Sequence, residues 1–159
     1  MSNDGMMEFS PLGKAIFKIN QITKQVWINY GYACLVIAGA DGEVAPAEFD
    51  FLAEEARAMG ATDDIIDAWR AYDFAGGDLN ALLPTLVADS PINAARSLIY
   101  TAVKMSRADG HYAVEEQAAV AKAAGILGID DHVVSAINGL VDLEDAVART
   151  RAGLLETGT

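Results

Sequence analysis

Two pairs of carboxylates at one fixed spacing are the residues of this sequence best suited to chemistry. Asp41 is followed directly by a glycine and, seven residues later, by Glu48, and the same arrangement recurs at Asp109 and Glu116. Carboxylate oxygens are the ligands that Ca²⁺ and Mg²⁺ prefer in proteins. The sequence therefore offers Asp41, Glu48, Asp109 and Glu116 as candidate metal ligands, with Ca²⁺ or another divalent cation as the candidate cofactor.

The same spacing also suits a structural role at the start of a helix. Residues 45–48, Ala-Pro-Ala-Glu, place proline at the first helical position and Glu48 at the third, where its carboxylate can accept hydrogen bonds from free N–H groups. Glu116 is placed likewise, and Asp41 and Asp109 are then exposed or self-capping turn residues. We favour capping for the two glutamates, so any cation would bind weakly, with a dissociation constant of about 10⁻⁴ to 10⁻³ M.

The motif matches only the second half of an EF-hand calcium loop. Placing Asp41 and Glu48 at the fifth and twelfth loop positions puts Ile37 and Gly39 at the first and third, where EF-hands carry oxygen ligands. The second copy has methionine and arginine at those positions, and it has His111 where the first copy has an acidic residue. Both loops are therefore excluded as EF-hands, and the second has the weaker charge for a cation.

The elements that position these motifs come from an internal duplication. Residues 32–68 align without a gap on residues 100–136, so that Gly60, for example, coincides with Gly128. In each copy, apolar residues recur at spacings of three and four, which predicts a helix, a short loop, a second helix ended by glycine, and a third helix. We predict that the two copies superpose, that their motif and helix-ending glycines adopt positive φ, and that neither copy contains a strand.

Further helices are expected outside the two copies. Ser10-Pro11 and Ser90-Pro91 each have the cap and first-turn chemistry of a helix start, and leucines between residues 79 and 86 mark a short helix that contains Pro84. The predicted fold is thus all-α, a bundle of seven to nine helices with an internal pseudo-twofold duplication. It forms a single domain over residues 1–159.

The composition limits the partners and the location of the protein. Its 159 residues carry a formal net charge of -12, which repels the phosphates of nucleic acids and of anionic lipids. The longest apolar run, residues 30–40, is about half of the roughly 20 residues that a transmembrane helix needs. The N-terminus lacks a secretory signal, and the single cysteine, Cys34, lies in that apolar run as a core residue. We expect a cytoplasmic protein that neither spans a membrane nor binds nucleic acid.

The paired Ala-Asp-Gly-x-x-x-x-x-Glu motifs, each closing one helix and opening another, resemble those of the tellurite-resistance TerB-like family. The resemblance covers most of the chain. It implies an all-helical bundle with pseudo-twofold symmetry, an acidic face built by both loops, bacterial origin, and a role in tellurite or other chemical stress with metal-ion binding rather than catalysis. The chain departs from the family at Ala45 and Ala113, where Ser or Thr is common, so the helix caps are weaker.

Three hypotheses for function follow. The first is a non-catalytic TerB-like binding module with an unidentified protein partner, and the second is a weak divalent-cation sensor that uses the paired loops. The third, a carboxylate-dependent hydrolase, requires two carboxylates to converge in a cleft with a perturbed pKa. The sequence has no nucleophile elbow or phosphate-binding loop, and His111 and His132 lack the spacing of a zinc motif. We therefore predict that the protein is not an enzyme; its partner and oligomeric state stay open.

Overall fold

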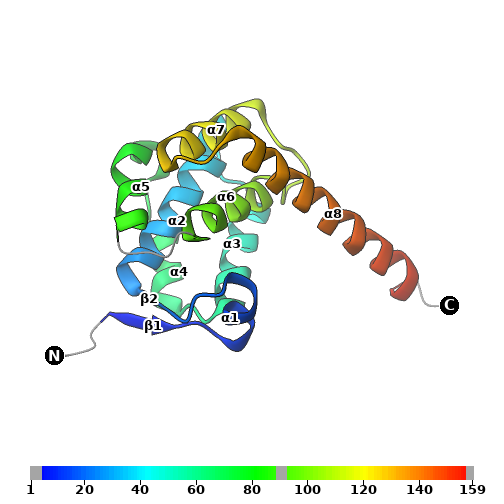
Figure 1. The fold of residues 1–159 in the computed structure, drawn as a ribbon, viewed down its shortest axis with the longest axis horizontal. Coiled ribbons are helices and arrows are strands. Elements are labelled where there is room, and N and C mark those ends of the chain that lie inside the picture. Colours follow the sequence, from blue (N-terminus) through cyan, green and yellow to red (C-terminus); the bar gives the residue numbers. More distant parts are fainter. Residues whose placement is uncertain (1–4, 89–92, 157–159) are drawn as a thin grey trace.

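The computed structural model describes residues 5–88 and 93–156, and these form a helical bundle (Figure 1). The described part of the chain contains eight α-helices and two short 3₁₀ helices, which confirms the all-α prediction of seven to nine helices. The α-helices are α1 (Pro11–Phe17), α2 (Lys24–Ala38), α3 (Pro46–Met59), α4 (Asp63–Arg70), α5 (Leu79–Ala88), α6 (Asn93–Ser106), α7 (Val114–Leu127) and α8 (Asp131–Leu155); the 3₁₀ helices are η1 (Gly39–Asp41) and η2 (Phe74–Gly76).

Two short strands near the N-terminus lie outside the two sequence copies, so the prediction that neither copy contains a strand is confirmed. β1 (Met6–Glu8) pairs with β2 (Gln21–Thr23) in antiparallel register, with Met7 opposite Ile22. Between them α1 ends at Lys18, whose positive φ of 60° turns the chain back toward β1. Segments of three residues are too short for an alternating apolar pattern to be recognised, so the sequence gives no signal for this pairing.

Helices α2 and α6, which each lead into one of the motif loops, contact each other at the centre of the bundle (Figure 1). Helix α2 also contacts α4 and α5, and α6 also contacts α3, α7 and α8. Their inward residues, among them Cys34, Ile37, Leu98 and Ile99, have no exposed surface. Cys34 is thus a core residue, as predicted, and its burial raises the pKa of the thiol.

The helix boundaries of the two sequence copies coincide. Helices α3 and α7 begin at residues 46 and 114 and end at 59 and 127, while α2 and α6 end at 38 and 106. Helices α4 and α8 begin at residues 63 and 131, but α4 ends at Arg70 whereas α8 continues to Leu155. The common helix-loop-helix path is therefore confirmed up to the start of the third helix, and superposition of the copies stays a prediction.

The glycines at the motif loops and helix ends have the predicted backbone conformation. Gly42 and Gly110 have φ of 102° and 87°, and Gly60 and Gly128, which end α3 and α7, have φ of 111° and 71°. Glycine adopts such values more readily than any other residue, so these four residues let the chain turn at the motif loops and at the ends of α3 and α7.

The other predicted helix starts have different outcomes. Ser10 caps α1 by accepting a hydrogen bond from the Gly13 N–H at 3.1 Å, and the short helix α5 contains Pro84 as expected. The predicted start at Ser90-Pro91 lies outside the described residues. No helix in the described part of the chain has both the length and the apolar character needed to cross a membrane.

Candidate functional site

The two motif glutamates lie at the starts of α3 and α7 and are almost fully buried, Glu48 being 2% exposed and Glu116 1% exposed. The Ala45 N–H donates to Glu48 Oε1 at 2.6 Å, and the Ala113 N–H donates to Glu116 Oε1 at 3.0 Å. Each carboxylate thus satisfies a backbone donor at the beginning of its own helix. The predicted capping role of both glutamates is confirmed, and the alanines in the cap positions add no side-chain bond.

The two motif aspartates fix the turns that precede these helices. The Glu43 N–H donates to Asp41 Oδ1 at 3.1 Å, and the His111 N–H donates to Asp109 Oδ1 at 2.9 Å. Both aspartates are exposed. They are the self-capping turn residues that the sequence predicted, and the bond is the same in both copies because the chain makes the same turn after each central helix.

The fold brings the two buried glutamates together, which the sequence could not show. Burial, followed by the hydrogen bond with Glu116 and the negative charges of Glu116 and Asp109, raises the pKa of Glu48 to about 8, although the Ala45 N–H acts in the opposite direction. Glu48 is therefore largely protonated at neutral pH. Glu116 Oε2 is buried and has no hydrogen-bond partner in the described residues. The interaction of Glu48 with Glu116 thus links the two copies.

The four candidate metal ligands are only partly assembled. Glu48 and Glu116 meet, and Asp109 is near enough to raise the pKa of Glu48, whereas Asp41 does not contribute to that shift. Across the described ranges, no three His, Cys, Asp or Glu side chains are grouped closely enough to hold a metal ion. Ca²⁺ takes six to eight oxygen ligands, so a cation here would have to displace the proton on Glu48 and complete its shell with water. Metal binding stays a prediction.

The glutamate pair has the converging carboxylates that a hydrolase needs, but it does not have the access to substrate. Two carboxylates converge and the pKa of Glu48 is raised, as a general acid requires. However, exposures of 2% and 1% mean that no substrate reaches these groups in this conformation. The arrangement is suited to joining the two halves and to fixing the loops.

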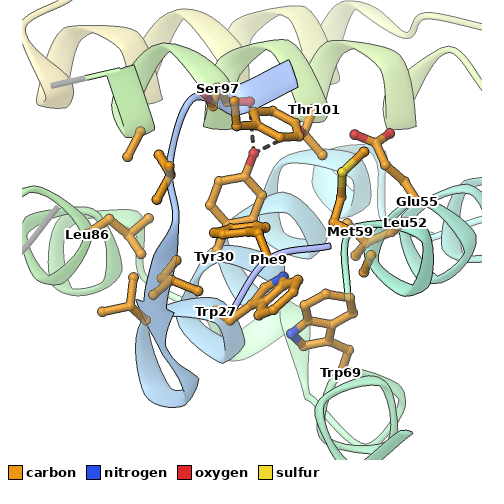
Figure 2. Close-up of a pocket in the computed structure, with 16 residues that line it drawn as sticks. Phe9, Trp27, Tyr30, Leu52, Glu55, Met59, Trp69, Leu86, Ser97 and Thr101 are labelled. Atoms are coloured by element: carbon orange, nitrogen blue, oxygen red, sulfur yellow. Dashed lines mark hydrogen bonds between the residues drawn. The ribbon is translucent and has the colours of Figure 1, made fainter. Parts of the chain in front are cut away.

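An apolar cavity of about 60 Å³ lies elsewhere in the bundle, between the N-terminal segment and helices α2, α3, α4 and α6 (Figure 2). Trp27 and Trp69 line it, and the Tyr30 hydroxyl at its inner end donates to the Ser97 carbonyl at 2.8 Å and bonds with the Thr101 hydroxyl at 2.7 Å (Figure 2). Ligand pockets usually measure roughly 300 to 1,000 Å³. This cavity is therefore a packing gap in the core.

Together these features define a class of protein: an all-helical bundle of two helix-loop-helix units, whose Asp-Gly loops are anchored by a pair of buried glutamates. One solved structure is similar over nearly the whole chain, namely the crystal structure of a tellurite resistance protein from Nostoc punctiforme. It is 27% identical in sequence, the match covers 94% of this chain and 98% of that chain, and the TM-score is 0.76. The resemblance to the tellurite-resistance TerB-like family is thereby confirmed. No protein-family model matches the sequence, and no curated protein matches it significantly.

Proposed function

We propose that this protein is a non-catalytic TerB-like module of tellurite or other chemical-stress response that acts by binding a protein partner through its two acidic loops. The convergence of both loops on the Glu48–Glu116 pair is the observation that carries the proposal. The similarity to a tellurite resistance protein over 94% of the chain supports the stress-response role.

The loops are well suited to recognition because their backbone is fixed while their outer carboxylates are exposed. Each loop is held by the aspartate turn at one end and by the glutamate cap at the other. Asp41, Glu43 and Asp109 remain exposed on this frame. Charges held in a fixed arrangement favour association with a partner of opposite charge, because little ordering is needed on binding. The expected partner therefore presents a basic surface.

A growth assay in a tellurite-sensitive bacterium tests this proposal. The unmodified protein should raise tolerance to tellurite, and the double variant Asp41→Asn, Asp109→Asn should lose that effect while it keeps its helix content. A matched control, Asp50→Asn with Asp67→Asn, removes the same charge from exposed positions outside the loops and should behave as the unmodified protein. Equal tolerance from both double variants would refute a role for the loops.

The second candidate function is a weak divalent-cation sensor, and the buried Glu116 Oε2 atom is the observation that favours it. Glu116 Oε2 is buried without a hydrogen-bond partner in the described residues, so it has acceptor capacity that a cation could fill. Calorimetric titration with Ca²⁺ should then show saturable binding with a dissociation constant of about 10⁻⁴ to 10⁻³ M. The Asp41→Asn, Asp109→Asn variant should lose this heat, whereas identical flat titrations for both proteins would exclude the sensor.

A further inference from the structure

Helix α8 extends well beyond the body of the protein. Its 25 residues span about 37 Å at 1.5 Å per residue. The first half packs on α6 and α7: Val141 is buried, Arg107 pairs with Asp142, and the Tyr100 hydroxyl donates to Glu144 at 2.6 Å. The second half projects away from the other helices (Figure 1).

The projecting half exposes large apolar side chains. Within the described chain, no residue from 145 to 155 is buried, and Leu154 and Leu155 are 76% and 74% exposed. A helical segment of this length is marginal in water unless an apolar face packs against something. Exposed apolar surface of this kind marks an interaction site.

The exposed apolar residues follow the coiled-coil pattern. A set of mostly apolar residues recurs at alternating spacings of three and four along the helix, as the a and d positions of a heptad do. We call this set the α8 stripe: Val133, Ala136, Leu140, Leu143, Val147, Thr150 and Leu154. All except the half-buried Val133 are exposed, and the stripe lies on a different face from Val141, which packs against the body.

We propose that the α8 stripe is a homodimer surface on which the α8 helices of two copies pair in antiparallel orientation. In this arrangement the projecting half of each helix covers the stripe on the body-bound half of the other. Both halves of the stripe are then removed from water, whereas a helix paired with the body of its own chain would cover neither.

The charges on α8 favour a second α8 helix as its partner, and they favour antiparallel over parallel pairing. Residues 146–155 contain two arginines and no acidic residue in a protein of net charge -12, whereas residues 131–145 contain Asp131, Asp142, Glu144 and Asp145. Antiparallel pairing sets the basic half of one helix against the acidic half of the other, and it brings Arg151 near Glu144 of the partner subunit. Parallel pairing would set like charges side by side.

One flank of the stripe also permits close approach. Gly139, Ala146 and Gly153 recur at intervals of seven residues beside the stripe, so small side chains line that edge along the helix. The distance between packed helices depends on the side chains at the contact, and small ones allow the helices to lie nearer together. The sequence of α8 therefore supplies both the apolar seam and the space for a second α8.

Analytical ultracentrifugation at about 100 µM protein, above the micromolar affinities of weak interfaces, tests the dimer. The protein should sediment as a dimer of twice its 16.8 kDa mass, and Leu143→Glu with Val147→Glu should be monomeric with unchanged helix content. Val114→Glu, at a 75% exposed position outside α8, is the matched control and should stay dimeric. A monomeric unmodified protein, or a dimeric double variant, would overturn the proposal.

Disulfide trapping tests the direction of pairing. In the antiparallel dimer, residue 136 of one helix lies beside residue 154 of the other, so mixing Ala136→Cys with Leu154→Cys protein should give the mixed disulfide. Two copies of residue 154 are then about 27 Å apart along the axis, beyond the roughly 7 Å that a disulfide spans. Cys34 is fully buried and does not interfere. Disulfides formed within each variant alone, without the mixed product, would show parallel pairing and contradict the proposal.

Discussion

At the scale of single residues, Glu48 and Glu116 each serve two purposes. Each carboxylate caps its own helix through Oε1, and the two carboxylates also interact with each other, which joins the two sequence copies. The first purpose is local and recurs in both copies. The second requires a proton, because two buried carboxylates cannot both be ionised at close range without a large cost.

The stability of the protein should therefore depend on pH through Glu48. Its pKa is raised to about 8 in the folded state from an ordinary value of 4.5, so its stabilising contribution is complete below pH 4.5 and is lost as the pH rises through 8. Glu48→Gln carries a permanent donor and no charge, so at pH 8.5 it should exceed the unmodified protein in unfolding free energy by on the order of 1 kcal/mol. Urea denaturation between pH 5 and 9 measures this.

Glu54→Gln, an exposed position on the same helix, is the control and should leave the pH profile unchanged. If Glu48→Gln were no more stable than the unmodified protein at pH 8.5, then Glu48 would not hold a proton in the folded state.

If a divalent cation binds at the glutamate pair, it must displace the proton on Glu48. The affinity for Ca²⁺ should then rise by up to about tenfold per pH unit below pH 8 and level off above it, because one proton is released for each ion bound. Titration calorimetry at pH 6, 7, 8 and 9 gives the slope. Glu48→Gln should abolish the dependence, and an affinity that does not change with pH would place the ion elsewhere.

At the scale of elements, glycine conformation and helix caps define the repeated helix-loop-helix unit. Helices α3 and α7 have the same length and begin and end at equivalent residues. The third helices differ, because α4 stops at Arg70 whereas α8 continues past the body to Leu155. The duplicated unit is thus fixed by its loops, and the two copies diverge in the length of the third helix.

Replacement of the motif glycines should isolate the cost of backbone strain. A Cβ at Gly42 or Gly110 would meet no atom within 4 Å, so Gly42→Ala should destabilise by about 1 kcal/mol through its positive φ alone. At Gly60 a Cβ would also lie 3.1 Å from the Ser10 backbone nitrogen, so Gly60→Ala should cost more. Thermal unfolding of the purified variants measures both.

Gly125 supplies the control for these variants. It lies inside α7 with ordinary helical geometry and open space around it, so Gly125→Ala should stabilise by roughly 0.5 to 1 kcal/mol. A loss of stability at Gly125 as large as that at Gly42 would show that strain at positive φ is not the cause.

At the scale of the whole molecule, acidic charge is the dominant electrostatic feature. Lys and Arg total 11 against 23 Asp and Glu, and the ion pairs of the described residues are mostly at the surface. Such pairs contribute little individually, whereas the excess negative charge repels itself in the folded state. The two exposed loops add to this repulsion. Binding of a basic partner or a cation to these loops would reduce it.

Salt should therefore stabilise the protein. Raising NaCl from about 0.02 M to 0.2 M shortens the screening length and should raise the melting temperature by about 2 to 4 °C, equivalent to roughly 1 kcal/mol. The Asp41→Asn, Asp109→Asn variant carries less charge and should respond less. Differential scanning calorimetry at constant protein concentration measures the shift, and a melting temperature that falls with salt would mean that attractive ion pairs dominate.

The sequence by itself determined the local structure. The two motifs predicted the positive φ of Gly42 and Gly110, the caps made by Glu48 and Glu116, and the common boundaries of the two helix-loop-helix units. These features depend on residues within about four positions of one another, so they can be read from spacing. The buried faces of α2 and α4 were predictable for the same reason, since helical periodicity places their apolar residues on one side.

Only the tertiary structure decided which of these local features meet. Glu48 and Glu116 are far apart in the chain, and their interaction depends on how α3 and α7 pack around α2 and α6. The pairing of β1 with β2 and the projection of α8 beyond the body likewise depend on where distant segments are placed. Spacing along a chain sets which side chains share a face. Contacts between faces come from the packing of the whole core, which no local pattern encodes.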